Sequence, residues 1–521
     1  MRAMLVALLA ACAAPVAAPD PGIPWVPTER AAGTLEEAIP SPLPRGPSAP
    51  RAEGCSEPTT WHADAHLQTL DHLRAFRCVG AITGTLVLEL QPDVAHLHPL
   101  DRLTRIGGSL IVRDSAGLAT LEGLEALRDV GGTVRIEDAQ GLSTLEGLDG
   151  LTAIRGDLVV QRAPNLTHLH ALDRLVALGG AVELAKLPSL ERLDGLRALA
   201  AIPDGLQLER LGLSQLDGLD ALTTVGGRLR LAELPALADL TGLDALTSVG
   251  RRLEVVSLPI TDLSGLGALR SVGATLWMAG NHRQVSMDGL SSLTSVGGLV
   301  LEGQDALRDL TGLRQLTSVG DVRLDHLPSL VTLDGLQGLD RVEGDLLVRE
   351  LHGLADLRGL DGVTHVDGDL TVSMLYGLRT LAGLGGLVEI GGTLALDELD
   401  ELRRVDDLSS LRRIGGSLSL RVLNELEGVA GWQALEHIGL HVLLEVLPRL
   451  THVDGFEALR VVGGVIEMSY VPALSDVRGL RNLVVVVDDI CIDAPLLCPT
   501  DFAAARLPPE AACGPGPSDG C

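Results

Sequence analysis

The sequence predicts an all-β solenoid of about 17 coils, each 23–24 residues long. Three observations predict it. An apolar residue followed by a glycine-rich corner returns at a fixed interval, the residues between corners are apolar at every third position, and a short alternating segment follows each corner. A coil of this length cannot bury a core alone, so neighbouring coils must stack. We expect a right-handed parallel β-helix of the leucine-rich-repeat type.

The corner residues fix the period of the repeat. Eighteen apolar anchors define seventeen successive intervals of 23 or 24 residues, with no long insertion. These anchors are Ile82, Ile106, Val130, Ile154, Leu178, Ile202, Val225, Val249, Val272, Val296, Val319, Val342, Val366, Ile390, Ile414, Ile438, Val462 and Val486. The regularity predicts one continuous array over residues 82–490 rather than a string of separate domains.

One unit shows the expected path of the chain. Between residues 118 and 130 every third residue is Leu or Val, a period that fits neither an α-helix nor a strand. It fits short 3₁₀-like or extended segments joined by corners. After the next glycine pair, Val134 and Ile136 alternate with Arg135, which is the period of a short strand.

Composition limits the core and the partners. Aromatic residues are 2% of the chain and hydrophobic residues 46%, so the core must be built from Leu, Val, Ile and Ala. The formal net charge is −28. A surface this acidic repels phosphate backbones, so we expect no nucleic-acid partner.

The N-terminus reads as an export signal. Arg2 precedes an apolar stretch that ends in Leu9-Ala10-Ala11-Cys12, which resembles a bacterial lipobox. Residues 1–11 are then a lipoprotein-type signal peptide, and Cys12 carries the lipid. The alternative is cleavage after Ala18, which leaves no anchor. Residues 12–54 hold the lipid anchor and a proline-rich linker, and we expect membrane contact only through that anchor.

The other six cysteines lie at the two ends of the repeat region. They are Cys55, Cys78, Cys491, Cys498, Cys513 and Cys521. Their placement predicts disulfide-bonded caps over residues 55–81 and 491–521, formed in an oxidising compartment. Cys55 has only Cys78 nearby. The last four cysteines allow three pairings, of which proximity favours Cys491–Cys498 with Cys513–Cys521. A short helix over residues 502–507, capped by Thr500 and Asp501, is expected in the second cap.

The repeat resembles a known family. Residues 145–160, Leu-Glu-Gly-Leu-Asp-Gly-Leu-Thr-Ala-Ile-Arg-Gly-Asp-Leu-Val-Val, are similar to the units of receptor L-domain proteins, the leucine-rich β-helical modules of insulin and epidermal growth factor receptors. Residues 78–86 and the closing Asp519-Gly520-Cys521 resemble bacterial surface lipoproteins of myxobacterial type that carry longer versions. The resemblance covers residues 55–521. It implies the fold, a surface location, a binding role and pairing of Cys55 with Cys78, but not receptor signalling.

The search for chemistry yields one tentative binding site and no catalytic one. No catalytic constellation is convincing, so we expect no enzyme activity, no cofactor and no metal site. Outward charges on the strands, such as Arg230 and Glu254, are expected to pair with one another. Trp277 falls at an outward strand position in an irregular unit and, with His282 and Arg283, forms the tentative binding site. The alternative is a Trp that only covers apolar neighbours.

These observations predict a non-catalytic binding or adhesion protein at the cell surface or outer membrane. A rigid solenoid would present an extended surface to an unknown protein or surface ligand, and we expect a monomer. A secreted or periplasmic location is the alternative to the lipid-anchored one. Two other functions stay open: a purely structural spacer of the cell envelope, and a polysaccharide-acting β-helix enzyme.

Overall fold

The computed structural model describes residues 55, 57–508 and 511–513. Residues 52–521 form one compact unit. The predicted signal peptide, the lipidated Cys12, the linker of residues 12–54 and Cys521 lie outside the described residues, so these predictions stay predictions.

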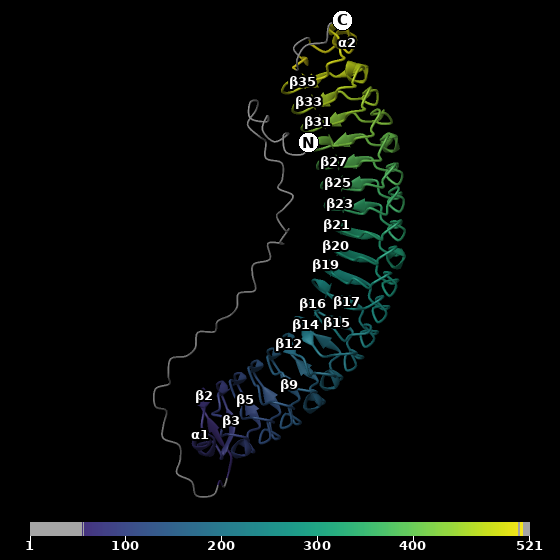
Figure 1. Ribbon diagram of the computed structural model, residues 1–521. Helices are drawn as coiled ribbons and strands as arrows, with labels where there is room; N and C mark the ends of the chain where they lie inside the picture. The colour runs from purple at the N-terminus through teal and green to yellow at the C-terminus, as the bar shows by residue number, and fades with distance from the viewer. Residues whose placement is uncertain (1–54, 56, 509–510, 514–521) are drawn as a thin grey trace, which may run out of the picture. The chain divides into compact units, whose positions relative to one another are not determined.

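The protein is a parallel β-solenoid, as the sequence predicts (Figure 1). Each coil adds one strand to a main sheet. Nineteen strands form this sheet, so eighteen turns separate the first from the last. They are β2 (Ala65–Leu67), β4 (Leu86–Leu88), β6 (Leu110–Arg113), β8 (Val134–Glu137), β10 (Leu158–Gln161), β12 (Val182–Leu187), β14 (Leu206–Leu211), β16 (Leu229–Ala232), β18 (Leu253–Val256), β19 (Ser271–Ala279), β20 (Ser295–Glu302), β21 (Ser318–Asp325), β23 (Leu346–Arg349), β25 (Leu370–Ser373), β27 (Leu394–Asp397), β29 (Leu418–Arg421), β31 (Val442–Glu445), β33 (Ile466–Ser469) and β35 (Ile490–Ile492).

A second set of short strands precedes the main sheet in most coils, across the glycine-rich corner. These are β1 (Thr59–Trp61), β3 (Val79–Ile82), β5 (Arg105–Ile106), β7 (Asp129–Val130), β9 (Ala153–Ile154), β11 (Ala177–Leu178), β13 (Ala201–Ile202), β15 (Thr224–Val225), β17 (Ser248–Val249), β22 (Arg341–Val342), β24 (His365–Val366), β26 (Glu389–Ile390), β28 (Arg413–Ile414), β30 (His437–Ile438), β32 (Val461–Val462) and β34 (Val485–Val486). Each predicted anchor ends one of these strands or lies within β19, β20 or β21.

Strands β20 and β21 have short corners. Val296 and Leu299 are three residues apart, whereas Val342 and Leu346, at the same two positions of a later coil, are four apart. In these two coils the corner strand and the main-sheet strand run together as a single strand of 8 residues. The sequence period of 23 in these coils therefore has a direct structural counterpart. Strand β19 is continuous as well, over 9 residues, although Val272 and Leu276 are four apart.

The run with a period of three contains short 3₁₀ turns, which confirms the predicted path. Leu121, Leu124 and Leu127 are fully buried along one such run. The 3₁₀ turns are η1 (His98–Leu100), η2 (His170–Leu172), η3 (Asp194–Leu196), η4 (Thr311–Leu313), η5 (Asp406–Leu408) and η6 (Arg478–Asn482). With three residues per turn, a 3₁₀ path presents every third side chain to the same side, here the core.

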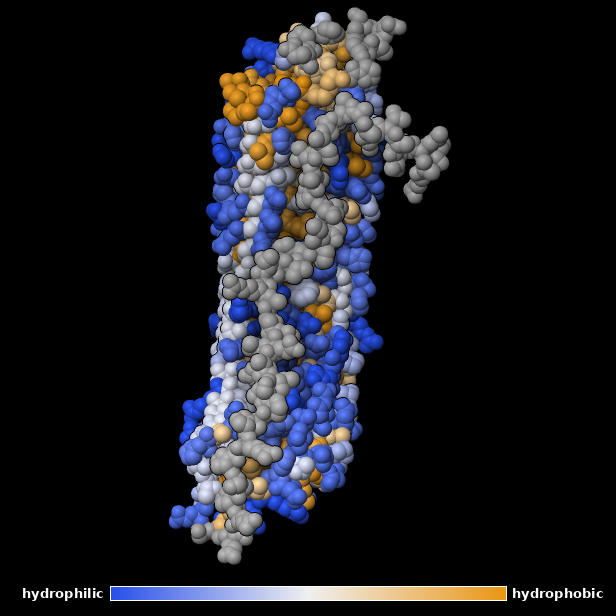
Figure 2. Space-filling view, turned by 90° about the vertical axis from the view of Figure 1, so that its left-hand side faces the viewer, coloured by the Kyte–Doolittle hydropathy of each residue, from blue (hydrophilic) through white to orange (hydrophobic). Residues whose placement is uncertain are grey.

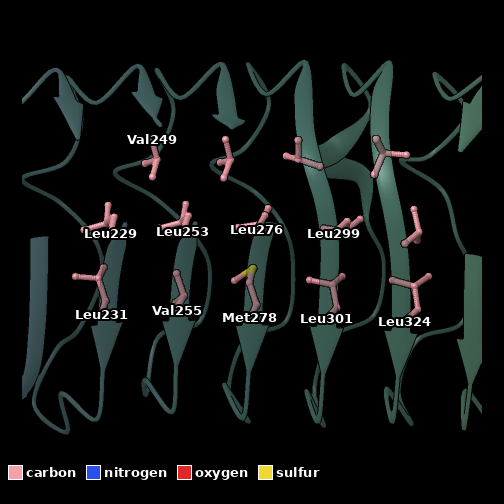
Figure 3. Packing of buried hydrophobic residues seen from close by; sticks show 14 of the residues in the cluster. Leu229, Leu231, Val249, Leu253, Val255, Leu276, Met278, Leu299, Leu301 and Leu324 are labelled. Atoms are coloured by element: carbon pink, nitrogen blue, oxygen red, sulfur yellow. The ribbon is translucent and has the colours of Figure 1, made fainter. Parts of the chain in front are cut away.

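The core consists of side-chain rows that run from coil to coil. Figure 3 shows two of them. One row joins Leu229, Leu253, Leu276 and Leu299, and the next joins Leu231, Val255, Met278, Leu301 and Leu324. All nine side chains are at most 1% exposed. Each fully buried side chain of this size contributes about 1.5–3 kcal/mol, and its cover comes from the neighbouring coils.

Both ends of the solenoid are closed by a cap. At the N-terminal end, helix α1 (Leu70–Ala75) follows β2, and Cys55 is bonded to Cys78 as predicted. At the C-terminal end, the predicted Cys491–Cys498 and Cys513–Cys521 bonds are both wrong, because Cys491 is bonded to Cys513. The last segment returns beside β35, where the Cys513 N–H donates to the Ile492 carbonyl. Cys498 is disulfide-bonded as well.

The predicted start of the C-terminal helix is also wrong. Helix α2 (Pro499–Ala504) begins before Thr500, with Cys498 as its N-cap residue. Asp501 is the third residue of the helix, and its Oδ2 accepts a hydrogen bond from the Cys498 N–H at 2.8 Å. A carboxylate at this position satisfies a free N–H of the first turn from inside the helix, so no cap at Thr500 is needed.

Two glycines with different surroundings test how tightly the coils stack. Gly335 has a φ of +124°, and a Cβ there would collide with the Leu310 carbonyl. We expect Gly335→Ala to lower the free energy of unfolding by about 2 kcal/mol or more. Gly205→Ala is the matched control, since its Cβ would meet only the Arg228 carbonyl oxygen at 3.1 Å and nitrogen at 3.8 Å. Thermal denaturation followed by circular dichroism measures both, and equal losses would contradict this packing.

Candidate functional site

The outward side chains of the main sheet form the candidate surface, called the strand face below. In β8, Val134 and Ile136 point into the core while Arg135 and Glu137 are only partly buried. The strands pair in parallel from β2 to β35, so outward residues line up from coil to coil. Figure 2 looks onto the side of the molecule on which these strands lie. Neighbouring rows are about 4.8 Å apart, which gives a regular array of side chains on a stiff support.

Charged side chains on this face pair locally, as predicted, but not always across strands. The Arg230 guanidinium donates to Glu254 of the next strand at 2.6 Å. Arg135, in contrast, pairs with Glu137 of its own strand at 2.8 Å. A partly exposed pair such as Arg135–Glu137 contributes at most about 1 kcal/mol.

The three residues of the tentative binding site do not come together. Trp277 lies on the strand face between Glu254 and Val300, which confirms its predicted position. His282 lies in the loop beyond the strand, where its Nδ1 is 2.9 Å from Asp305 of the next coil. Arg283 is exposed in the same loop. Of the three residues, Trp277 alone lies within a strand of the main sheet.

The irregular sequence around Trp277 has a structural explanation. Asn281 is fully buried at a position where the preceding coil carries Leu258 and the following coil carries a buried Gln304. Its Oδ1 accepts from the Leu258 N–H and its Nδ2 donates to the Val255 carbonyl, both at 2.9 Å. Both bonds satisfy backbone groups of the preceding coil, so Asn281 is a stacking residue rather than a ligand-binding one.

An arginine cluster next to Trp277 is the most unusual feature of the strand face. Glu254 is buried, with 2% of its side chain exposed, and its carboxylate forms ion pairs with three arginines. Arg230 Nη1 lies 2.6 Å, Arg228 Nε 3.3 Å and Arg252 Nη1 3.6 Å from its carboxylate oxygens. One carboxylate cannot neutralise three guanidinium groups, so donor capacity is left over.

Arg252 connects this cluster to Trp277. Its guanidinium carbon lies 5.9 Å from the centre of the indole ring, within the range of a cation–π contact. Its Nε is buried and has no hydrogen-bond partner among the described residues. Trp277, Arg230 and Glu254 can be recognised from the sequence as outward strand residues, whereas Arg228 and Arg252 cannot. The available signal was an Arg at a corner position where other coils carry Ser, Thr or Asp.

That corner position normally carries a hydrogen-bond acceptor. The Asp157 carboxylate, for example, accepts from the Ala181 N–H of the next coil at 2.8 Å. We call this series of side-chain-to-backbone bonds the corner ladder. It runs through Asp64, Thr85, Ser109, Thr133 and Asp157, and again through Asp321, Asp345, Asp369, Thr393, Ser417 and His441.

The corner ladder is interrupted in the coils that form the arginine cluster. The residues at this position are Ala181, Gly205, Arg228 and Arg252, and none of these side chains can accept a hydrogen bond. The N–H groups of Gly205 and Arg228 consequently have no acceptor among the residues that the structure describes. The interruption and the arginine cluster occupy the same stretch of the solenoid.

A second surface feature lies at the C-terminal end, where apolar residues gather (Figure 2). An apolar hollow of about 390 Å³ is lined by Val446, Pro448, Tyr470, Val471, Pro472, Asp493 and Pro495. Tyr470 is 64% exposed beside it. The hollow carries a single acidic group and no cluster of polar groups, so it offers shape and apolar contact only.

Within residues 55, 57–508 and 511–513, no group of three or more His, Cys, Asp or Glu side chains could hold a metal ion. No helix in this part of the chain is long and apolar enough to cross a membrane.

Comparison with known proteins adds little to this picture. No family model matches the chain, and no curated protein is similar to it in sequence. Among solved structures, it is similar to a chain in the TLR13–ssRNA13 complex, with 15% identity and a TM-score of 0.33, covering 85% of this chain and 81% of that one. It is also similar to an internalin, InlF, from Listeria monocytogenes, with 15% identity and a TM-score of 0.30, covering 68% of this chain and 84% of that one.

One carboxyl on the strand face gives a pH-dependent test of its charge balance. Burial raises the pKa of Glu445, and the nearby Glu467 raises it further. A carboxyl whose pKa is raised by folding destabilises the folded state when ionised, and the effect disappears below the pH at which it is protonated in both states. We expect Glu445→Gln to raise the melting temperature slightly at neutral pH, by about 1 °C, and not at about pH 4.

Asp397→Asn is the control for this measurement. The Asp397 carboxylate holds Arg421 through two hydrogen bonds of 3.0 and 2.7 Å, so its removal should lower the melting temperature at neutral pH. A Glu445→Gln protein that is less stable than the parent at neutral pH would contradict the assigned effect of burial.

Proposed function

We propose that this chain is an exported, non-catalytic binding protein that uses the strand face of its solenoid to hold a protein partner. One observation carries the proposal. In the middle of the strand face, Trp277 and three arginines around Glu254 form a site with unsatisfied donors. Side chains that serve only to stack coils would not need such a site, whereas Trp and Arg are the residues most enriched where binding energy concentrates.

The alternative of a purely structural spacer explains less. A spacer needs stacking, caps and a soluble surface, and the regular coils at both ends provide these. It gives no reason for a buried Glu254 that is surrounded by Arg228, Arg230 and Arg252. The buried Nε of Arg252 also has no hydrogen-bond partner among the described residues, and an unpaired buried donor is costly, which favours a role beyond stacking. A polysaccharide-acting enzyme remains the least supported alternative, since it would need a base beside clustered carboxylates.

Export is supported by the disulfide bonds. Cys55–Cys78 and Cys491–Cys513 close the two caps, and such bonds persist in oxidising compartments. The proposal adds the lipid anchor at Cys12 and a cell-surface or outer-membrane location, both from the sequence. A proline-rich linker of residues 12–54 would then hold the strand face away from the membrane.

Truncating one outward side chain on the strand face and one exposed apolar side chain away from it tests the binding role. The immobilised chain would first be used to recover a cross-linked partner from cell-envelope extract. Trp277→Ala should lower the affinity for that partner by about tenfold or more, because a central aromatic contact is lost. Val331→Ser is the matched control, since Val331 is 62% exposed and lies outside the main-sheet strands. Equal retention by both variants in a titration would contradict the strand face as the binding surface.

The lipid anchor has its own test. Expressed with its N-terminus intact in a bacterium that processes lipoproteins, the chain should incorporate labelled palmitate and sediment with membranes. Cys12→Ser should abolish both, because the thiol that carries the lipid is gone. Labelling that persists in Cys12→Ser, or a parent chain that never takes up label, would favour ordinary cleavage after Ala18.

A further inference from the structure

We propose that the interruption of the corner ladder at Gly205 binds a carboxylate from an acidic peptide segment of the protein partner. This inference rests on the proposed function and specifies the chemistry of its ligand. It concerns Gly205, Arg228, Arg230, Arg252 and the adjoining Trp277, which lie on successive coils of the main sheet.

The geometry of the regular coils shows what belongs at this position. Asp157 and Asp321 each place a carboxylate oxygen where it accepts from the N–H of the next coil, at 2.8 and 2.9 Å. At Gly205 the corresponding donor is the Arg228 N–H, and the side chain is missing. Only the Arg228 carbonyl oxygen and nitrogen lie within 4 Å of a Cβ at this glycine, at 3.1 and 3.8 Å. A ligand carboxylate can therefore occupy the place that an Asp side chain takes elsewhere.

The arginine cluster supplies the charge for that carboxylate. Arg228, Arg230 and Arg252 face Glu254, and Arg230 also lies 3.4 Å from Glu209. Three arginines thus face two glutamates, which is a local concentration of positive groups in a chain whose net charge is −28. The side chain of Arg228 is 43% exposed, so part of it is accessible to a ligand. Hydrogen bonds to an ionised acceptor are about twice as strong as neutral ones.

Trp277 and Val300 favour a peptide over an acidic sugar chain. They lie side by side on the strand face and offer an apolar surface. Trp277 is three strands from Gly205 along the register, or about 14 Å, which an extended peptide spans with about four residues. An acidic residue at Gly205 and an apolar residue four positions away would contact both. Sugar rings often stack on aromatic side chains, and aromatics are only 2% of this chain.

The decisive variant is Gly205→Asp, which supplies the ladder residue that the other coils already contain. Its carboxylate should accept from the Arg228 N–H and fill the position, so the melting temperature should stay the same or rise. Binding of fluorescein-labelled poly-L-glutamate, measured by anisotropy at low salt, should weaken by about tenfold or more. Arg228→Gln, which leaves the corner backbone intact, should also weaken it. These results together would support the site.

Two controls separate the site from general charge effects. Arg349 and Arg323 both form ion pairs with the buried Asp325, next to an intact stretch of the corner ladder. Arg349→Ala should leave the affinity for poly-L-glutamate unchanged. Asp204→Asn removes a carboxylate adjacent to the proposed site and should tighten binding by about twofold to threefold. A loss in Arg349→Ala equal to that in Gly205→Asp would overturn the inference.

Other outcomes are equally clear. Poly-L-glutamate that does not bind the parent chain, or binds the stable Gly205→Asp protein as well as the parent, overturns the inference. Polygalacturonate that binds more tightly, with the same sensitivity to Gly205→Asp, overturns the assignment to a peptide. If the recovered partner is lost in Trp277→Ala but kept in Gly205→Asp, the carboxylate site is wrong while the proposed function stands.

Discussion

Burial of each coil by the next is the interaction on which the whole structure depends. Inward residues such as Leu253 and Val255 are fully buried only because Leu229 and Leu231 precede them and Leu276 and Met278 follow. A change of register by one residue would turn these side chains outward. The 23–24-residue period is therefore a physical requirement of stacking. It explains why the fold can be predicted from the sequence.

The same stacking imposes backbone conformations that cannot be predicted from the sequence. In most coils the residue just after the main-sheet strand has a positive φ, between 50° and 58° where it is not a glycine, at positions as different as Asp138, Arg162 and Val446. A β-branched side chain such as that of Val446 disfavours this conformation. The chain must turn there to bring the next segment of the coil into register with the neighbouring coils. The stacking of coils, and not the residue type, therefore determines the backbone conformation at this position.

The limits of prediction follow from the same distinction. Anchors, strands, 3₁₀ turns and the position of Trp277 depend on periodicity, which is visible along the chain. The partners of Trp277 depend on which way a corner side chain points, and the reach of Arg228 to Glu254 of the next coil is visible only in space. Cys491 likewise pairs with Cys513 rather than the nearer Cys498, because the last segment returns to the sheet.

In a repeat protein the regular coils act as an internal reference for the irregular ones. All four intervals of 23 residues fall between Ile202 and Val342, and the corner ladder is broken from Ala181 to Gly298. Arg228, Arg252 and Trp277 lie within this same stretch. Each coil contacts mainly its neighbours, so a local departure weakens stacking there and leaves distant coils intact. Departures from an otherwise consistent design are expected where a site must do something other than hold the fold. The irregular middle of the solenoid, rather than its more regular ends, is therefore where binding should be sought.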